Sequence, residues 1–518
     1  MTVVAVGVLS FGLAPAEATS RTLSPMGSAT TRCRTSTFPL EPLAQARGQA
    51  EKMLKRMTLD QEVTLLHGVG EGKAPSGTVG ATAAIPGLDI PAINQQDGPA
   101  GVGDGITGVT QLPAPEALAA TFDPTAATCY GQVIGTEARG KGINLVYGPT
   151  INIVRVPQWG RAFETLGEDP TLTGAIGSAE VDGIQRTGTM AQVKHYAVYN
   201  QETNRLSSTD DAVVGQKALQ EIYLSAWRQV LQAGPSSVMC SYSTINGIAA
   251  CQNKALLGGY LDTTLHFAGF VGSDYSATHS TVASIDNGLD QEQPTSTYLG
   301  STLVAAVKDG EVSRSAVDEA ALRVLTQICR FRLFTDDAKG SIVDNVATPA
   351  ADEVTNEVAE EGTVLLKNAA GALPLAAKEK GGLAVIGPAA QSDPVTVGGG
   401  SATVEASRLI TPLAGIRAAV ATTTAPTYRV GLPGPADFSP IPRTYLTAAY
   451  PTPGEPLVLS ATLKPPETGT YELAFSEPPY YVPVTLFLDG RPVATNPGTT
   501  PRATYTATVR LAAGRTYT

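Results

Sequence analysis

The sequence has few charged residues and lacks the short motifs of several common protein classes. Charged side chains make up 16% of its 518 residues, below the usual ~25% of globular proteins. The formal net charge is −11, which argues against nucleic acid or an anionic membrane as a partner. The phosphate-binding pattern GxxxxGK followed by Ser or Thr and the hydrolase pattern GxSxG are both absent.

The cysteines and histidines also lack the spacing of a metal site. None of the five cysteines forms a CxxC pair, and none of the four histidines forms HxH or HxxxH. A structural zinc site is therefore not expected. One GxGxxG pattern spans residues 103–108, but the proline-containing stretch 111–115 follows where a dinucleotide-binding fold needs a helix. We interpret it as a loop and expect no metal or organic cofactor.

The amino-terminal residues have the composition of a secretory signal. Residues 3–14 are largely apolar, and small-residue patterns follow at 14–16 and 16–18. The apolar run is too short to span a bilayer. We expect a signal peptide over 1–18 and a secreted protein, with a buried strand as the alternative. Signal peptides usually begin with a basic residue, and Met1 and Thr2 supply none, so the true start is left open.

Apolar runs and amphipathic stretches alternate over residues 40–334, which is typical of βα units with a parallel sheet. Polar residues follow the apolar runs, as expected at the active-site edge of a (β/α)8 barrel. A doubly wound sheet also binds ligands at its strand ends, but it would not need reactive residues on so many strands. We therefore favour the barrel. Expected helices cover 49–57, 125–141, 215–232, 301–307 and 315–331, with Thr58 and Gln61 capping another; expected strands cover 90–93, 143–147, 191–193, 237–239 and 269–271.

The pattern changes after the predicted barrel. Residues 335–350 are expected to form a linker, and 351–436 a second α/β layer domain with a helix over 352–367 and a buried strand over 383–387. From 437 to 518 the pattern predicts an all-β module. Its expected strands are 471–475, 484–488 and 504–511, with a hairpin turn at Asp489-Gly490. The last residues read like the start of another strand, so we expect an incomplete chain.

Two basic clusters and two carboxylates are candidates for chemistry. Arg161 and the pair Lys194-His195 suit a ligand rich in hydroxyl groups. Asp274 ends an apolar strand, where an ionised carboxylate is costly unless it is partnered. Asp97, followed by Gly-Pro, is a second candidate clamp for hydroxyls. The alternative in each case is a buried ion-pair network that only holds the loops together.

Several ordered motifs resemble glycoside hydrolase family 3, from about residue 45 to 430. The resemblance implies a TIM-like (β/α)8 barrel followed by an α/β sandwich domain, which an all-β module similar to PA14 interrupts. The motifs are Asp97-Gly98-Pro99-Ala100-Gly101-Val102, Gly160-Arg161-Ala162-Phe163-Glu164, Lys194-His195-Tyr196, Ser237-Val238-Met239-Cys240-Ser241-Tyr242, Asn246-Gly247, Gly269-Phe270-Val271-Gly272-Ser273-Asp274-Tyr275 and Glu361-Gly362-Thr363-Val364-Leu365-Leu366-Lys367-Asn368.

The resemblance also implies a role for each matching residue. Asp274 matches the catalytic nucleophile. Tyr275 stands where many members have Trp, as a platform under the sugar, and Ser401 matches a second-domain residue that reaches the same site. The residues that match the pocket for the terminal sugar are Asp97, Arg161, Lys194, His195, Arg205, Met239 and Tyr242.

Three departures from the family pattern affect the site. Gly103 stands where many members have Arg, so one hydroxyl clamp is missing or replaced. Tyr275 gives a smaller platform than Trp. The family's acid/base Glu is expected after the PA14-like module, outside this chain. The His-Asp dyad of another branch is not expected, because the pattern that identifies it is absent after Lys194.

The sequence thus predicts an exo-acting retaining β-glycosidase, most simply a β-glucosidase acting on oligosaccharides or glycosides. A β-xylosidase or α-L-arabinofuranosidase is the alternative within the family, and a non-catalytic carbohydrate-binding protein is the alternative from another class. The oligomeric state is left open. Cys240 and Cys251 flank the turn at Asn246-Gly247, so we expect a disulfide between them in an exported protein, with two free thiols as the alternative.

Overall fold

The computed structural model divides the chain into two compact units, which are described separately. The first unit comprises residues 18–366 and 397–409, and the second comprises 1–17, 367–396 and 410–518. The structure describes residues 37–207, 210–369, 371–374, 383–391, 394–396, 398–420, 426–430, 446–449, 458–465, 468–476, 484–496 and 504–518. The expected signal peptide lies outside these residues.

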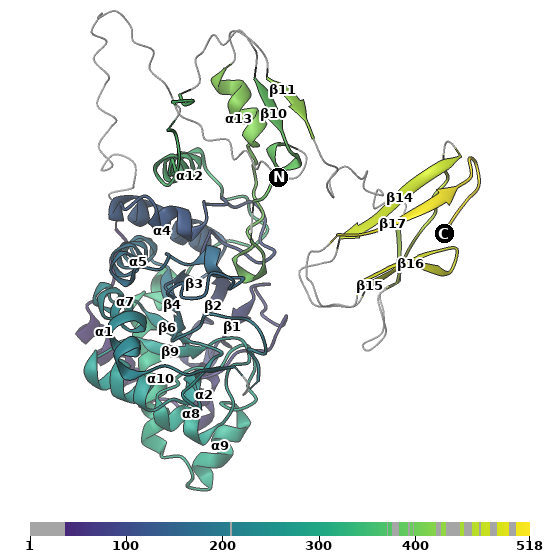
Figure 1. Cartoon of the computed structure of the whole chain (residues 1–518). Coiled ribbons are helices and arrows are strands. Elements are labelled where there is room, and N and C mark those ends of the chain that lie inside the picture. The colour runs from purple at the N-terminus through teal and green to yellow at the C-terminus, as the bar shows by residue number, and fades with distance from the viewer. Residues whose placement is uncertain are drawn as a thin grey trace, which may run out of the picture. The chain divides into compact units, whose positions relative to one another are not determined.

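A six-stranded sheet forms the interior of the first unit, with the order β1-β2-β3-β4-β6-β9. Neighbouring strands from β2 to β9 are parallel, whereas β1 is antiparallel to β2. Figure 1 shows helices α4, α5 and α7 along the outside of the strands. The strands are β1 (Gly80–Ala81), β2 (Asn94–Asp97), β3 (Leu145–Thr150), β4 (Met190–Tyr196), β6 (Ser237–Cys240) and β9 (Phe270–Ser273).

The expectation of eight parallel strands is therefore corrected by the described residues. Two irregular segments take the places of the missing strands and close the ring. Single parallel bridges join Gly272 to Gln291 and His67 to Glu292. The Val69 amide then donates to the Ala81 carbonyl of β1 at 3.0 Å. The ring has eight positions, but regular strands form only six of them.

The helices of the first unit follow the predicted alternation, with corrections at several boundaries. Thr58 and Gln61 form the expected capping box at the start of α2. The stretch 215–232 is broken by a π-helical turn at Leu219–Tyr223, and β2 begins four residues after the predicted start at residue 90. Helix α5 was not among the predicted ones. The helices are α1 (Leu43–Leu54), α2 (Leu59–Leu65), α3 (Pro115–Ala119), α4 (Pro124–Gly140), α5 (Pro170–Gln185), α6 (Gln216–Ala218), α7 (Ser225–Val230), α8 (Val282–Asn287), α9 (Ser301–Lys308), α10 (Arg314–Arg330), α11 (Leu333–Asp336) and α12 (Pro349–Glu361).

The boundary between the units also differs from the predicted domains. The predicted linker 335–350 begins with the end of α11 and leads into α12, and both helices belong to the first unit. Lys141 holds this segment, because its ammonium donates to the carbonyls of Thr107 at 2.5 Å and Ile342 at 2.8 Å. Residues 397–409, predicted in the second domain, likewise belong to the first unit.

The described part of the second unit contains short α/β elements and antiparallel β pairs. The strand at 384–386 is not buried as predicted, since Ile386 is 64% exposed. Asp489 and Gly490 both have positive φ and join β15 to β16, as the predicted hairpin requires. The elements are β10 (Ala384–Ile386), α13 (Pro412–Ala419), β11 (Thr427–Arg429), β12 (Leu446–Ala449), β13 (Val458–Ala461), β14 (Gly469–Ser476), β15 (Val484–Leu488), β16 (Arg491–Asn496) and β17 (Thr504–Leu511).

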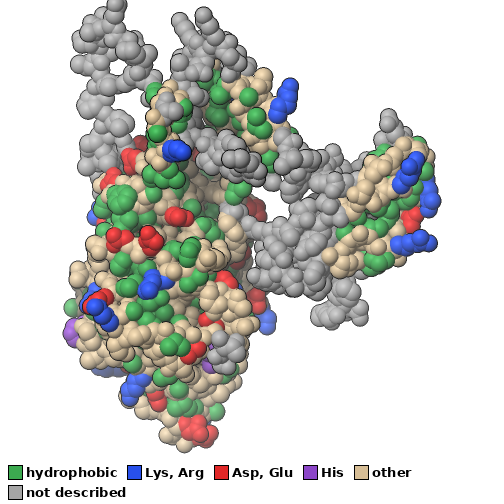
Figure 2. Space-filling view, viewed as in Figure 1, with side chains coloured by type: hydrophobic (Ala, Val, Ile, Leu, Met, Phe, Trp, Pro, Cys, Tyr) green, Lys and Arg blue, Asp and Glu red, His purple; other side chains and the backbone are tan. Residues whose placement is uncertain are grey.

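Acidic, basic and hydrophobic side chains are interspersed over the face of the first unit that Figure 2 shows. Within the described ranges, no helix is long and apolar enough to cross a membrane. The same residues contain no group of three or more His, Cys, Asp or Glu side chains placed to hold a metal ion.

Close packing of α4 against α5 buries a carboxyl group in the first unit. A Cβ on Gly131 would lie 2.3 Å from the Glu180 carbonyl, and one on Gly183 would lie 2.2 Å from the Thr128 carbonyl. The two helices can approach this closely because both positions are glycine. Glu180 is fully buried between them, and neither of its carboxyl oxygens has a hydrogen-bond partner. Burial raises its pKa to about 8.

We expect Glu180→Gln to flatten the pH dependence of stability. The folded chain holds the Glu180 proton up to pH about 8, whereas an unfolded Glu loses it near about 4.5. Between these values the folded state binds the extra proton, so its stability falls as pH rises, by up to about 1.4 kcal/mol per pH unit. Both tryptophans, Trp159 and Trp227, lie in the first unit, so urea unfolding followed by their fluorescence measures this loss.

The matched control is Asp182→Asn, because Asp182 lies on the same helix with a side chain 42% exposed. In this variant the free energy of unfolding should fall with pH as steeply as in the wild type between about pH 5 and about pH 8. An equal slope in wild type and Glu180→Gln would show that Glu180 does not carry the proton.

Candidate active site

The carboxyl ends of the parallel strands bring the predicted site residues together. Asp97 ends β2, Lys194 and His195 lie on β4, and Asp274 directly follows β9. Because the strands are parallel, these ends meet at one edge of the sheet. The Asp274 amide donates to the Cys240 carbonyl at 3.1 Å, which ties the end of β9 to the end of β6.

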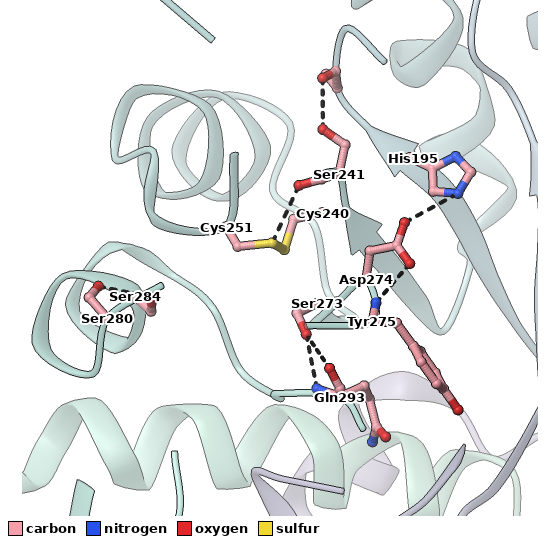
Figure 3. Close-up of a disulfide and its surroundings, with 11 residues drawn as sticks. His195, Cys240, Ser241, Cys251, Ser273, Asp274, Tyr275, Ser280, Ser284 and Gln293 are labelled. Atoms are coloured by element: carbon pink, nitrogen blue, oxygen red, sulfur yellow. Dashed lines mark hydrogen bonds and ion pairs between the residues drawn. A yellow bond between two sulfur atoms is a disulfide. The ribbon is translucent and has the colours of Figure 1, made fainter. Parts of the chain in front are cut away.

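Asp274 is a buried carboxylate with one oxygen left for chemistry. The residue is 7% exposed, and its Oδ1 accepts the Tyr275 amide at 2.8 Å. Its Oδ2 has no hydrogen-bond partner and lies 3.4 Å from Nε2 of His195, as Figure 3 shows. Burial raises the pKa of Asp274, while the charges of Arg161 and Lys194 oppose that rise and favour the ionised form.

His195 is neutral, and its hydrogen bonds define the tautomer. Asn152 donates to the His195 carbonyl and accepts its amide, both at 2.9 Å, so the side-chain oxygen of Asn152 is fixed. Nδ1 of His195 lies 2.9 Å from that oxygen and must carry the proton. Nε2 then accepts from Arg161 at 3.0 Å. Burial and the nearby Arg161 and Lys194 hold the pKa of His195 well below its usual value.

Arg161 links the barrel site to residue 401. Its Nε donates to Glu164 at 2.8 Å, and the Glu164 side chain is only 1% exposed. One terminal nitrogen of Arg161 also lies 3.5 Å from the Ser401 hydroxyl. Ser401 therefore lies in the first unit beside the site, although the sequence placed it in the second domain.

Lys194 forms the second ion pair of the site, with Asp97. The two side chains are 3.3 Å apart, at 2% and 10% exposure. Burial raises the pKa of Asp97 to about 6, since the attraction of Lys194 offsets only part of the desolvation. Asp104 and Asp274 raise this pKa further because they add negative charge nearby.

Arg205 belongs to a third group, which the sequence identified only in part. It donates to Glu202 at 2.7 Å and to the Tyr199 hydroxyl at 3.2 Å. Its guanidinium lies 4.5 Å from the ring centre of Tyr242. Tyr199 in turn packs edge-on against His195, with ring centres 5.1 Å apart. Tyr199 therefore joins the Arg205 group to His195.

The remaining predicted residues lie on the same strand ends. The Tyr275 hydroxyl donates to the Val79 carbonyl, which fixes its ring near the end of β9. Met239 is buried on β6 and pairs in register with Gly272 of β9. The predicted disulfide between Cys240 and Cys251 is present, with Cα atoms 5.2 Å apart (Figure 3).

Sequence reasoning assigned no role to Asn152, Tyr199 or Glu202. Asn152 lies two residues beyond the end of β3, so the strand-end argument could have found it. Tyr199, Glu202 and Arg205 are spaced three apart, and this spacing was a further signal. Glu202 accepts hydrogen bonds from Trp159, Tyr199 and Arg205.

These contacts define a site in which one unpartnered carboxylate oxygen is surrounded by fixed donors. Asp274 supplies the oxygen, while Lys194 and Arg161 supply the positive charge around it. A neutral His195 cannot protonate a leaving group at its Nε2 but can remain in a fixed network. Such an arrangement fits nucleophilic attack on a neutral, hydroxyl-rich substrate.

Comparison with known families agrees with this chemistry. Residues 78–327 match the glycosyl hydrolase family 3 N terminal domain, and residues 363–512 match the glycosyl hydrolase family 3 C-terminal domain. Between them the two matches cover more than half of the chain. The chain belongs to glycosyl hydrolase family 3.

Among its relatives is a beta-glucosidase of Rhizobium radiobacter, 37% identical over 74% of this chain and 46% of the relative. The solved beta-glucosidase DesR of Streptomyces venezuelae, in complex with D-glucose, has a TM-score of 0.72 at 33% identity, covering 90% of this chain and 61% of that one. A Trichoderma reesei beta-D-glucoside glucohydrolase has a TM-score of 0.69 at 31% identity, covering 76% and 57%. The chain spans about half the length of its curated relatives.

Lys194→Met should raise the pKa of Asp97 above its wild-type value of about 6. The substitution removes the cation 3.3 Å away that stabilises the ionised form of Asp97. Carbon-13 NMR of labelled Asp side chains measures the titration, and Asp97→Asn assigns the resonance. Lys217→Met is the control, since Lys217 has an 85% exposed side chain paired with Glu221. An unchanged Asp97 titration in the Lys194 variant would contradict the pairing.

Proposed function

We propose that this protein is a retaining exo-β-glycosidase, most simply a β-glucosidase, with Asp274 as its nucleophile. The observation that carries the proposal is the unpartnered Oδ2 of Asp274, buried at a strand end and facing His195. Lys194 and Arg161 favour the ionised carboxylate that attack requires. The relatives are named beta-glucosidases, and one of them was solved with D-glucose, which favours glucose as the terminal sugar.

The proposed reaction takes two steps. The Asp274 carboxylate attacks the anomeric carbon, a carbon–oxygen bond forms, and the bond to the leaving oxygen breaks. Water then attacks the same carbon, so the ester to Asp274 breaks and the sugar leaves with retained configuration. In this proposal the ion pair of Asp97 with Lys194 and the group of Arg161, His195 and Arg205 hold the sugar hydroxyls. Met239, Tyr242, Tyr275 and Ser401 line the same pocket.

The general acid is proposed to be a different carboxyl group from those around Asp274. Glu164 and Glu202 each pair with an arginine, and Asp97 pairs with Lys194. Each of these carboxylates already contacts a cationic side chain of the site, so we do not assign any of them as the general acid. From the family resemblance we propose that the acid belongs to the second domain. We therefore choose for testing a substrate whose leaving group needs little protonation.

The type of the β module, secretion and the sugar specificity are also proposed, from the sequence. The β module over 437–518 is proposed to be PA14-like, and the protein is proposed to be secreted. A β-xylosidase or α-L-arabinofuranosidase is the competing specificity. A panel of 4-nitrophenyl glycosides separates these activities, and sugar binding without turnover of any of them would favour a carbohydrate-binding protein.

We expect Asp274→Ala to lose hydrolysis of 2,4-dinitrophenyl β-glucoside by several orders of magnitude, because the covalent route is removed. Added azide should restore turnover and give α-glucosyl azide, since a small anion can occupy the space of the carboxylate. Steady-state kinetics and product NMR measure both effects. If the variant keeps more than about a tenth of the wild-type kcat, a loss below ~1.4 kcal/mol, Asp274 is not the nucleophile.

The control for this experiment is Asp290→Asn. Asp290 is also buried, but its Oδ2 accepts the Val271 amide at 2.7 Å within the strand layer. This variant should gain no activity with azide. Azide rescue of Asp290→Asn would point to a general effect of buried carboxylates rather than to nucleophilic attack.

A further inference from the structure

A second polar hollow lies beside the candidate active site, at the carboxyl ends of the same strands. Its volume is about 540 Å³. Arg155 in its lining follows β3, and Ser243 follows β6. The lining residues that follow β4 are Val198, Asn200, Gln201, Thr203 and Asn204. These strands also carry the site around Asp274, so the hollow opens at the same edge of the sheet.

One loop contributes to both places. Tyr199, Glu202 and Arg205 form the hydrogen-bonded group of the active site. The residues between them, Asn200, Gln201 and Asn204 among others, line the hollow instead. Every third residue of this loop, from Tyr199 to Arg205, therefore belongs to the candidate active site, while residues between them line the hollow.

Two buried oxygens in the lining of the hollow have no donor among the described residues. Asp210 is 4% exposed, and its Oδ1 accepts a hydrogen bond from Gln201, but its Oδ2 has no partner. The side-chain oxygen of Asn200 is likewise unpartnered, although its nitrogen donates to the Ile153 carbonyl at 2.5 Å. Buried acceptors without a donor are costly, so a ligand that brings hydroxyl donors would recover this cost.

The walls of the hollow are fixed and include an aromatic ring. Asn246 accepts the Val214 amide at 2.9 Å and donates to the Val214 carbonyl at 3.0 Å. Asp211 accepts the Gly247 amide at 3.0 Å, which ties the strand β5 (Asp211–Ala212) to the turn at Asn246-Gly247. Tyr223 is half-buried, and the Arg155 guanidinium lies 5.6 Å from its ring centre. An aromatic ring beside acceptors and amides is the chemistry that binds a sugar ring.

We propose that this hollow is a second sugar-binding subsite, in which Asp210 and Asn200 accept hydroxyl hydrogens and Tyr223 stacks against the ring. The proposal rests on the proposed function, because it takes the ligand to be a further sugar unit of the same oligosaccharide class. It adds a sugar site that none of the residues assigned to the Asp274 pocket forms.

Fluorine NMR of the 518-residue chain labelled with 3-fluorotyrosine separates the two sites. The Tyr223 resonance reports the hollow and the Tyr242 resonance reports the Asp274 site, each assigned by its Tyr→Phe variant. Titration with cellobiose should shift both resonances with saturation. Asp210→Ala should raise the dissociation constant read from Tyr223 at least about tenfold and leave the constant read from Tyr242 unchanged. Asp210→Asn, which keeps the shape of the side chain, should give a smaller rise in the same direction.

The matched control is Glu221→Gln, an exposed carboxylate on the π-helical turn that carries Tyr223. It should leave both constants at their wild-type values. A shift of Tyr242 without any shift of Tyr223 overturns the subsite and leaves the proposed function standing. A shift of Tyr223 alone supports the subsite and counts against the proposed function. If neither resonance moves, or if both Asp210 variants bind like wild type, the subsite is overturned.

Discussion

The site depends on positive charges that favour the ionised form of one carboxylate where water is largely excluded. Asp274 is buried, and burial alone favours its protonated form. Arg161 and Lys194 counter that effect, but each is itself buried beside the site and needs its own anionic partner. Glu164 and Asp97 supply those partners. The charges around Asp274 are thus an interdependent set, in which removing one partner of an ion pair leaves a buried charge unpaired.

The neutral state of His195 also follows from the buried charges around Asp274. A protonated imidazole would add a third positive charge beside Arg161 and Lys194, which together with burial keep its pKa low. Asn152 fixes the ring so that Nε2 accepts from Arg161. The guanidinium of Arg161 therefore bridges Glu164 and His195 and stays in place beside Asp274. The hydrogen bonds that hold Arg161 in place therefore determine both the charge distribution and the geometry of the site.

Part of this arrangement could be predicted from the sequence, because strand ends in βα units meet at one edge. Asp97, Lys194 and Asp274 were found in this way, and the motifs added Arg161 and Arg205. The closure of the ring could not be predicted, since the segments around His67 and Gln291 pair through single bridges and leave no alternating pattern. Tertiary packing also decided the unit boundary, because α12 and residues 397–409 group with the barrel.

Side-chain partnerships were harder to predict than positions. Glu202 pairs with Arg205 across a turn rather than along a strand or a helix face, so the sequence marks the pair only by its spacing of three residues. Likewise, nothing in the sequence indicates that Asp210 is left with an unpartnered oxygen, because that depends on what the neighbouring loop offers it. Periodicity locates backbone elements, whereas the satisfaction of buried polar atoms follows from the packed structure.

The most direct test of the account is to trap the covalent intermediate. Reaction with 2,4-dinitrophenyl 2-deoxy-2-fluoro-β-glucoside slows the second step, so a nucleophilic enzyme accumulates as its fluoroglucosyl ester. Peptide mass mapping then locates the label. The account predicts one label per chain, on the peptide that contains Asp274 and on that carboxylate. A label on another carboxylate, or steady hydrolysis without any labelled enzyme, would contradict it.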